Sequence, residues 1–467
     1  MRSIHDLRAS GDSRRFTDEM EVMMEDIEDS NSASLARRRS GMIELARRLV
    51  NDDFRTRFTH SGYKYRVFSG CQDVQDPIVG YALAAAISII LAFLPQVQSS
   101  IDVEILTMKS LTNMLDHVKD IEVISRERKM NMSKGAQTLL TDFKTVTRSL
   151  PLWEGNVPMF MSPCLLGLRA LDELVQSSRA ISTSQTIANE ALVSTIVLKT
   201  IDIIEHHLKL LPSAPKQYVQ SYGLELEFAL SIMESYTLSP ACCADASLWT
   251  EKLLSQLVTS IDSILGMNME LGSRTKFLCL RLCLNLANNN ERNSDAFNVP
   301  SLIASLMDFI STGLGTSVSE LELDDGVQKL DMVILALGTM INLVEWSVSV
   351  RKTVLDNTSK QLDALVQAFV KNRELVYEVD SLKESHTNVL HGYLAVLLGN
   401  LCHEPPLRKH IVAKLPKERL GMVIEAVEEF IEHHKTADSQ EEAKDVWVAF
   451  TARLQTVAEG LKHLTSE

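Results

Sequence analysis

The sequence predicts an all-α protein, a HEAT- or armadillo-like solenoid of helical repeats with loops inserted between the repeats. Three observations lead to this prediction: long apolar and amphipathic stretches, no convincing alternating strand, and a recurring phrase that ends in Asn-Leu. Only 19 glycines and 12 prolines occur in 467 residues, so long stretches lack turn residues. Apolar residues make up 45% of the chain and charged residues 23%, which is typical of globular proteins rather than disordered ones.

The helices expected in the first half follow from apolar residues that recur every three or four positions. They cover residues 16–29, 35–50, 78–94, 102–118, 136–147, 164–177 and 187–210, and a short helix begins at Phe54 and stops at Gly62. Residues 63–70 fit a short helix or a strand, and both alternatives stay open. Residues 125–135 are polar and are expected to form a loop, and residues 151–163, with three prolines, form an irregular connection.

One segment, residues 78–94, could mimic a membrane span because it is uncharged and rich in Ala, Ile and Leu. It falls short of the ~20 residues that a bilayer requires. Pro77 and Pro95 bracket it, and no basic residue anchors either end. We therefore predict a buried central helix.

The helices expected in the second half cover residues 217–235, 246–265, 272–289, 300–313, 328–346, 350–356, 359–371, 387–402, 405–414, 416–434 and 440–463. The break from Pro212 to Pro215 favours a hinge between two halves. We thus expect an N-terminal lobe, residues 1–212, and a C-terminal lobe, residues 213–467, within one continuous domain. An acidic insertion is expected at residues 314–327.

Three apolar stretches in the second half end in the same pair of residues, Asn-Leu, at Asn285, Asn342 and Asn400. These asparagines are 57 and 58 residues apart, and a shorter amphipathic segment follows each stretch. The repeats therefore cover residues 277–297, 333–355 and 392–411. Such equal spacing is typical of stacked helical repeats, and a period above the usual ~40–47 residues indicates inserted loops. Because neighbouring helix pairs bury one another's apolar faces, we expect a continuous core.

The repeated asparagine has two interpretations. In the first, which we favour, its amide satisfies backbone groups at the end of the buried helix, because a buried amide must find hydrogen bonds. In the second, it lines a groove and binds an extended partner, as in armadillo importins. Gly338 and Gly399 each cost about 1 kcal/mol of helix propensity relative to alanine, so we expect them to allow close helix approach at the repeat interface.

The charge balance argues against nucleic-acid binding by the whole surface, because a net charge of -14 offers no basic footprint for phosphates. One basic segment, Arg37–Arg39 with Arg47 and Arg48, is interpreted as a solvated helix face rather than a phosphate site. The seven cysteines show no metal spacing and no disulfide framework, which indicates a reducing compartment. Cys279 and Cys283, one helical turn apart in an apolar stretch, are expected to be core thiols.

No set of residues points to catalysis, a metal or a cofactor. The pairs His206–His207 and His433–His434 fall on polar helix ends, with the two rings of each pair on different faces. His403–Glu404 is followed by proline, where the zinc-protease motif requires a continuing helix. Phosphate-binding glycine motifs do not occur. We therefore expect neither an enzyme nor a small-molecule substrate.

Several phrases together resemble one known family. Leu337–Glu345, followed by Arg351, resembles the G-x-x-I-N-L-V-E phrase of the wings-apart-like (WAPL) cohesin-release domain. The other matching phrases are the opening ones at residues 6–11, 15–19 and 39–46, the aromatic phrase at 54–62 and the late helix at 391–399. No phrase of residues 120–275 matches, and this middle is where divergence of a fungal kind is expected.

The resemblance implies a nuclear, chromatin-associated HEAT-like solenoid without catalytic activity. Members of that family bind cohesin, including its SMC ATPase head and its HEAT-repeat accessory subunits, and promote ring opening and release from DNA. Neither direct nucleic-acid binding nor membrane binding is expected. A second hypothesis is a generic armadillo-type adaptor or transport receptor that binds an extended basic peptide along the asparagine groove.

The candidate partner-binding residues are exposed polar positions in the matched phrases: Arg8, Arg15, Asp18, Glu19, Glu345 and Arg351. Two alternatives remain open. Asp18 or Glu19 could instead pair within the chain, with Arg15 or with Arg37–Arg39. Likewise, Glu345 could brace the turn of its repeat.

Overall fold

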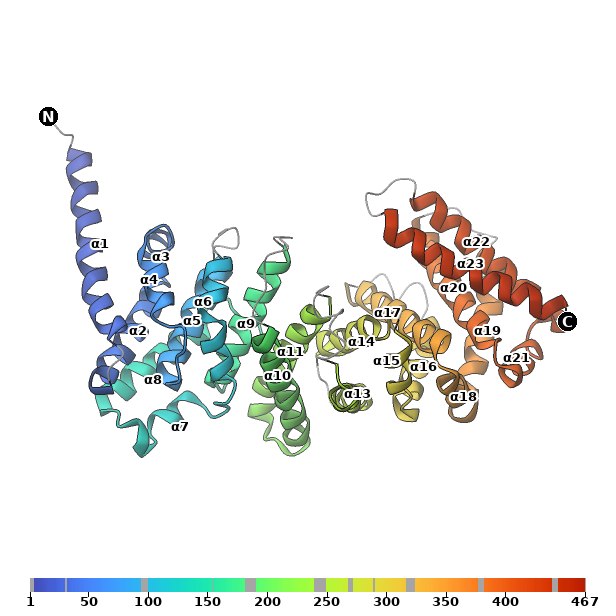
Figure 1. The fold of residues 1–467 in the computed structure, drawn as a ribbon, viewed down its shortest axis with the longest axis horizontal. Helices are drawn as coiled ribbons and strands as arrows, with labels where there is room; N and C mark the ends of the chain where they lie inside the picture. Colours follow the sequence, from blue (N-terminus) through green and yellow to red (C-terminus); the bar gives the residue numbers. More distant parts are fainter. Residues whose placement is uncertain are drawn as a thin grey trace. The chain divides into compact units, whose positions relative to one another are not determined.

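Every regular element that the structure describes is a helix, which confirms the predicted all-α class (Figure 1). The structure is a computed structural model, and it describes residues 4–29, 32–93, 100–153, 155–180, 190–238, 249–267, 272–288, 290–315, 324–376, 382–438 and 444–466. By their contacts the residues form two compact units, Met1–Ser239 and Pro240–Glu467.

Unit 1 contains a succession of helices and short 3-10 turns. They are α1 (Ile4–Glu28), η1 (Ser32–Ser34), α2 (Leu35–Arg48), α3 (Asp52–Thr59), α4 (Tyr63–Ser69), α5 (Pro77–Phe93), α6 (Ser100–Met114), α7 (Ile121–Ser125), η2 (Arg128–Met130), α8 (Lys134–Ser149), α9 (Pro163–Ala180), α10 (Glu190–Leu210), η3 (Leu211–Ser213) and α11 (Lys216–Thr237). The open question at residues 63–70 is thus resolved as a helix, α4.

The core of unit 1 forms around α5, which packs against α2, α6 and α9. All residues of α5 from Pro77 to Ile90 are buried, so the predicted buried central helix is confirmed. Gly80 allows this packing, because a Cβ there would overlap the side chain of Met114 in α6. Within the described ranges, no single helix is long and apolar enough to cross a membrane; residues 328–346 and 348–357 meet that criterion only as a pair bent by 118°.

Unit 2 continues the succession after the described residues resume. Its elements are α13 (Glu251–Gly266), α14 (Ser273–Ala287), α15 (Glu291–Ala296), α16 (Pro300–Gly315), α17 (Asp324–Trp346), α18 (Val348–Asn357), α19 (Ser359–Val376), α20 (Leu382–Leu401), α21 (Pro405–Val412), η5 (Pro416–Glu418), α22 (Gly421–Asp438) and α23 (Lys444–Ser466). The acidic insertion expected at residues 314–327 falls partly outside the described residues and partly on the ends of α16 and α17.

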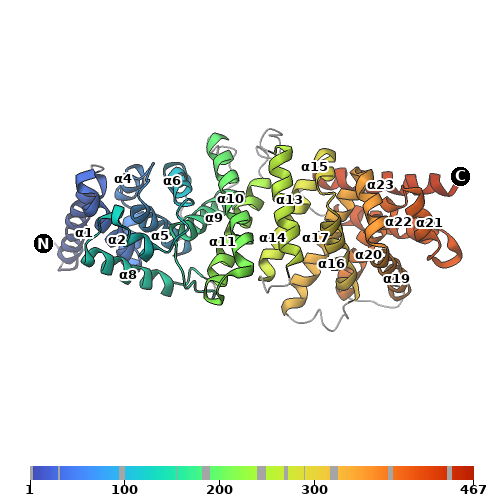
Figure 2. The same cartoon turned by 90° about the horizontal axis from the view of Figure 1, so that it is seen from below.

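The Asn-Leu repeats of unit 2 each contain three helices, long, short and long. They are α14–α15–α16, α17–α18–α19 and α20–α21–α22. The first helices pack in one row, α14 on α17 and α17 on α20, and the third helices α16 and α19 pack beside them (Figures 1 and 2). The third helix has 16 residues in α16 and 18 in α19 and α22. It accounts for much of the long repeat period, which was expected to come from inserted loops.

The two repeat glycines lie at close helix contacts, as expected. A Cβ at Gly338 would lie 3.1 Å from Leu284 Cδ1 of α14, and one at Gly399 would lie 3.1 Å from Val457 and Leu461 of α23. Cys279 and Cys283 are fully buried core thiols, as predicted. Burial raises the pKa of Cys283 to about 12, which keeps the thiol protonated.

The predicted lobe boundary at residues 212 and 213 falls before α11. That helix packs against α9 and α10, because its buried face completes the core of unit 1. Contacts therefore divide the chain later, between Ser239 and Pro240. Whether the two units act as separate functional lobes stays a prediction.

Candidate functional site

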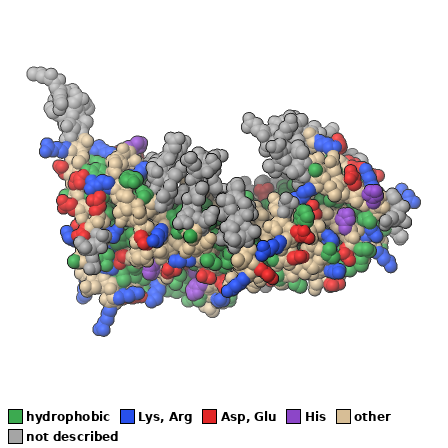
Figure 3. All heavy atoms as spheres, in the orientation of Figure 1, with side chains coloured by type: hydrophobic (Ala, Val, Ile, Leu, Met, Phe, Trp, Pro, Cys, Tyr) green, Lys and Arg blue, Asp and Glu red, His purple; other side chains and the backbone are tan. Residues whose placement is uncertain are grey.

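Helix α1 presents one apolar face and one charged face. Met20, Met23, Met24 and Ile27 follow helical spacing and are buried, and α1 packs against α2 and α4. The opposite face leaves Asp18 and Val22 exposed, with Val22 64% exposed. Acidic and basic side chains intermingle over this end of unit 1 (Figure 3).

A shallow groove of about 510 Å³ runs between α1 and α2. It is lined by Asp18, Glu19, Val22, Met23 and Asp26 from α1 and by Ser40, Gly41, Glu44 and Arg48 from α2. Gly41 sets the spacing of the two helices, because a Cβ there would lie 3.1 Å from Asp26 Cβ. Four carboxylates and one guanidinium give the lining a net negative charge.

Three of these charged groups form ion pairs, and Arg15 beside the groove is a fourth member of the network. Arg48 donates to Glu19 at 2.5 Å and to Glu44 at 2.9 Å, and Arg15 donates to Glu19 at 2.9 Å. These hydrogen bonds from Arg15 and Arg48 hold the pKa of the Glu19 carboxyl below its usual value. Asp18, by contrast, is exposed and forms no ion pair with any described residue. It is the carboxylate of the groove that is available to a partner.

The predicted candidates on α1 thus have different surroundings. Asp18 and Glu19 line the groove, and Arg15 lies beside it as the partner of Glu19. The open alternative of internal pairing is realised for Glu19 with Arg15 and also with Arg48. Arg8 belongs to α1, but its side chain lies outside the described residues.

The basic segment at Arg37–Arg39 is not one solvated face, so that interpretation was wrong for Arg39. Arg39 is 6% exposed and donates to Asp76 at 2.6 Å and to the Met130 carbonyl at 2.6 Å. Arg38 donates to the Gly70 carbonyl at 2.7 Å. A guanidinium is buried here because carboxylate and carbonyl acceptors from distant residues meet it, which the local sequence does not reveal.

The candidates Glu345 and Arg351 both have partners within unit 2. Arg351 donates to the carbonyls of Val344 and Glu345, and it thereby caps the end of α17. Burial lowers the pKa of this guanidinium. Glu345 accepts from Arg453 Nε of α23 at 3.2 Å. The carboxylate of Glu345 thus pairs with α23 and not with the turn of its own repeat. Partner binding by either residue stays a prediction.

The asparagines do not form the expected set of identical backbone caps. Asn342 is 6% exposed, and its Oδ1 accepts from Arg453 Nη2 at 3.1 Å rather than from the backbone. Asn400 is 3% exposed, and its Nδ2 has no hydrogen-bond partner among the described residues. In the first repeat Asn293 caps the helix instead, with Nδ2 2.9 Å from the Leu286 carbonyl, while Asn285 is half-buried. Asn342 departs from the expectation because α23 covers its face.

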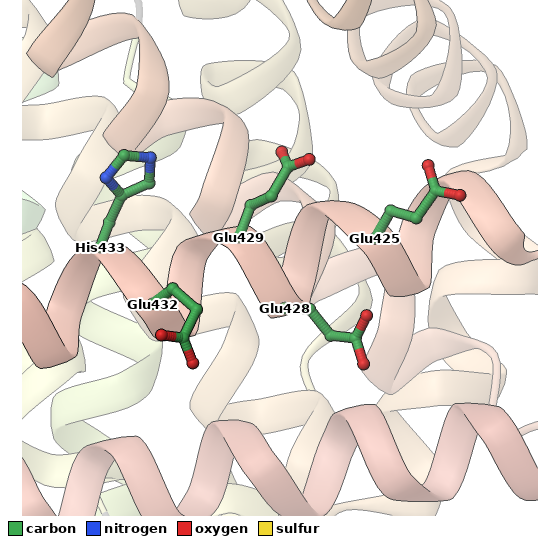
Figure 4. Close-up of a pocket in the computed structure, with 5 residues that line it drawn as sticks. All are labelled: Glu425, Glu428, Glu429, Glu432 and His433. Carbon is green, nitrogen blue, oxygen red and sulfur yellow. The ribbon is translucent and has the colours of Figure 1, made fainter.

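Sequence reasoning missed a second acidic hollow, of about 430 Å³, on α22. Its described lining is Glu425, Glu428, Glu429, Glu432 and His433, with Glu425, Glu429 and His433 on one side of the helix in Figure 4. The buried Arg373 of α19 donates to Glu429 at 2.8 Å, and Lys462 of α23 lies 2.5 Å from Glu428. The run Val-Glu-Glu-Phe-Ile-Glu-His-His was the available signal. These ion pairs hold neighbouring helices together.

The expectation that His206 and His207 both lie on a polar helix end was wrong for His207. His207 is fully buried, and its Nε2 contacts the buried carboxylate of Glu225. Ser162 Oγ donates to the other oxygen of Glu225 at 2.5 Å and accepts from the Leu165 amide at 2.8 Å. The serine thus donates to the glutamate, and no hydrogen bond joins it to His207 among the described residues. The set braces α9, α10 and α11.

Comparison with known proteins agrees with this architecture. The family model described as "Wings apart-like protein regulation of heterochromatin" matches residues 1–350. A comparison with functionally curated proteins found no match. Among solved structures, one described as the structure of the Wpl1 protein is 13% identical, with a TM-score of 0.52 over 97% of this chain and 99% of that one.

Two further solved structures are less similar. An engineered protein is 12% identical over 94% of this chain and 98% of its own, with a TM-score of 0.36. A chain from a study of a phosphorylation switch between cadherin and beta-catenin is 12% identical over 94% of this chain and 100% of its own, with a TM-score of 0.30.

Proposed function

We propose a function from one premise: this chain belongs to the wings apart-like (WAPL) family of heterochromatin regulators. In our proposal it is a non-catalytic, protein-binding scaffold in the nucleus that engages cohesin and promotes its release from chromatin. It would thereby regulate sister-chromatid cohesion. The proposed partners are cohesin subunits, namely the SMC ATPase head and the HEAT-repeat accessory subunits, with no direct contact to nucleic acid.

The observation that carries this proposal is the acidic groove between α1 and α2. Its net negative lining suits a basic surface of a protein partner, and charge complementarity governs the rate and specificity of such encounters. Val22, 64% exposed at its edge, offers apolar contact area, and the unpaired Asp18 lies beside it. The groove lies on packed helices, so these groups are held in place before a partner arrives.

The experiment that tests the proposal is a charge reversal at Asp18. Asp18→Lys leaves the ion pairs of Glu19 intact, so we expect a folded protein whose co-purification with cohesin subunits falls by about tenfold. The double change Asp18→Lys/Glu19→Lys should abolish binding, although it also breaks the contacts of Glu19 with Arg15 and Arg48. Pull-down with purified cohesin at two salt concentrations measures both variants, and the defect should be larger at low salt.

The matched control is Asp356→Lys, the same charge change at an exposed position of α18 in unit 2. We expect this control to bind like the unchanged protein. If Asp18→Lys retains its helical circular dichroism and melting temperature and still binds cohesin fully, the groove is not the docking surface.

The armadillo-type adaptor or transport receptor remains the alternative proposal, but the surroundings of its groove residues weigh against it. Asn342 is engaged by Arg453, and Asn400 is nearly inaccessible. Only Asn285 is partly exposed. A titration with a panel of basic peptides separates the hypotheses, because the adaptor requires binding that is lost on Asn285→Ala, whereas cohesin release does not.

A further inference from the structure

The end of α17 contains a pair of acceptors that together recognise an arginine. Asn342 and Glu345 lie one helical turn apart, so both side chains point to the same side. Arg453 of α23 donates from Nη2 to Asn342 Oδ1 at 3.1 Å and from Nε to Glu345 Oε1 at 3.2 Å, and Nη2 also contacts Glu345 Oε2. Such bidentate pairing is selective for a planar guanidinium over an ammonium group.

The same face of α23 continues onto the next repeat. Val457 and Leu461 pack where Gly399 of α20 has no side chain, each 3.1 Å from the position a Cβ would take. These residues follow Arg453 by four and eight positions, so all three share one helix face. Val457 is 6% exposed and Leu461 is fully buried. An arginine and two apolar side chains on one helix thus contact two successive repeats.

The arginine preference belongs to the second repeat alone. The residue three positions after the repeated asparagine is Glu345 there, but Asn288 in the first repeat and His403 in the third. Only the second repeat therefore combines an amide oxygen with a carboxylate. The glycine that admits the apolar residues is likewise specific, since Gly399 has Leu284 as its counterpart in the first repeat. The arrangement is a particular site, not a general property of the repeats.

We propose that Asn342, Glu345 and Gly399 form a helix-docking site that α23 occupies in cis. The site is specific for a helix that presents an arginine followed by apolar residues four and eight positions later. A partner helix with this pattern takes the site in exchange for α23. The proposal concerns unit 2 and is independent of the acidic groove on α1 and α2.

Exchange is physically reasonable because of the place of α23 in unit 2. It packs mainly against α20 and α22 and reaches α17 through Arg453, whereas α17 and α20 are each packed between several helices. Elements with fewer packing partners open at a lower free-energy cost than the core. When α23 opens, the carboxylate of Glu345 and the buried amide of Asn342 lose their donor, and a guanidinium in trans restores it.

The test uses a fluorescent peptide of residues 444–466 and the full chain. We expect the peptide to bind an Arg453→Ala chain about tenfold more tightly than the unchanged chain, because the competing helix in cis has lost its charge-assisted hydrogen bonds. A peptide carrying Arg453→Ala should bind the same variant about tenfold more weakly than the unchanged peptide. Fluorescence anisotropy measures all three affinities.

Two controls assign the effect to the proposed acceptors. With a chain carrying Glu345→Gln and Arg453→Ala, the advantage of the arginine peptide over the alanine peptide should largely disappear. Hydrogen exchange measures how often α23 leaves the site. Amides of α23 should exchange about tenfold faster in Arg453→Ala than in the unchanged chain, while those of α13 do not change. Arg453→Lys retains the charge but not the planar geometry. Its peptide affinity and its α23 exchange rate should lie between those of the unchanged chain and those of Arg453→Ala.

Equal binding of the arginine and alanine peptides to the Arg453→Ala and Arg453→Lys chains would overturn the proposal. So would unchanged exchange of α23 in both variants, because Arg453 would then contribute nothing to holding the helix on this site.

Discussion

His391 on α20 is a buried titratable group without a hydrogen-bond partner. It is 5% exposed, and neither ring nitrogen has a partner among the described residues. The ring stacks on Phe369 with an interplanar angle of 1° and centroids 4.7 Å apart. Burial, and then the charge of Arg373, lower its pKa from 6.5 to about 4, although Glu429 acts in the opposite sense. The folded protein therefore keeps this imidazole neutral.

This histidine should make unit 2 less stable in mild acid. Between pH 6.5 and about 4 the unfolded chain binds a proton that the folded chain does not, so the stability present above pH 6.5 is lost as the pH falls. The cited pKa values correspond to a loss of about 2 kcal/mol at pH 5. We predict that His391→Leu removes this part of the pH dependence. Urea unfolding of both proteins at pH 7 and pH 5 measures it.

The decisive quantity is the difference between the two proteins in how much their free energy of unfolding falls from pH 7 to pH 5. Other groups also titrate in this range and contribute equally to both proteins. If the free energy of unfolding falls equally in the unchanged protein and in His391→Leu, the ring is not held neutral by burial. A further variant, His410→Leu, serves as the control. His410 is half-exposed and its Nε2 lies 2.7 Å from Asp363 Oδ1, so it does not share the buried, unpaired surroundings of His391.

Among the elements, α20 shows how glycines determine helix spacing. A Cβ at Gly392 would overlap the ring of Phe430 in α22, whereas Gly223 in the middle of α11 has no heavy atom within 4 Å of that position. We predict that Gly392→Ala destabilises the protein by about 1–3 kcal/mol, because the aromatic ring is buried and cannot move aside freely.

The same change at Gly223 should have the opposite effect. Gly223→Ala should stabilise the protein by up to about 1 kcal/mol through helix propensity alone. Urea denaturation of both variants measures the two effects on one scale. A stabilising Gly392→Ala would show that α20 and α22 can separate without cost.

The repeat elements also show which parts of a repeat can be predicted from sequence and which cannot. The Asn-Leu phrase identified α14, α17 and α20 because an apolar helix with a polar end is a strong local signal. Their third helices, α16, α19 and α22, were each predicted as helices but were not assigned to the repeat. That assignment requires knowing that α16 packs against α17 and α19, a relation between distant segments.

For the whole molecule, each compact unit has a buried core of its own. Leu168 of α9 is fully buried in unit 1, and Leu397 of α20 is fully buried in unit 2. Either Leu→Ala change should cost about 2–5 kcal/mol locally. We predict that Leu397→Ala raises amide hydrogen exchange within Pro240–Glu467 much more than within Met1–Ser239, and that Leu168→Ala does the reverse.

Hydrogen exchange with peptide-level mass spectrometry of the full chain measures this prediction. Equal acceleration throughout the chain by either variant would show that it unfolds as one cooperative unit. In that event the two units are not independent parts of the solenoid, and the division into lobes has no energetic meaning.

The sequence by itself determined the class of fold, most of the longer helices, the central buried helix and the first helix of each repeat, because these depend on the spacing of apolar residues along a short stretch of chain. It also singled out Asp18 and Glu19, which line the acidic groove. Only the tertiary structure decided which charges remain available. Glu19 is neutralised by Arg48, 29 positions away, and Glu345 by Arg453, 108 positions away. Such pairs form through space, since electrostatic attraction depends on the distance between two groups and not on their separation in the chain.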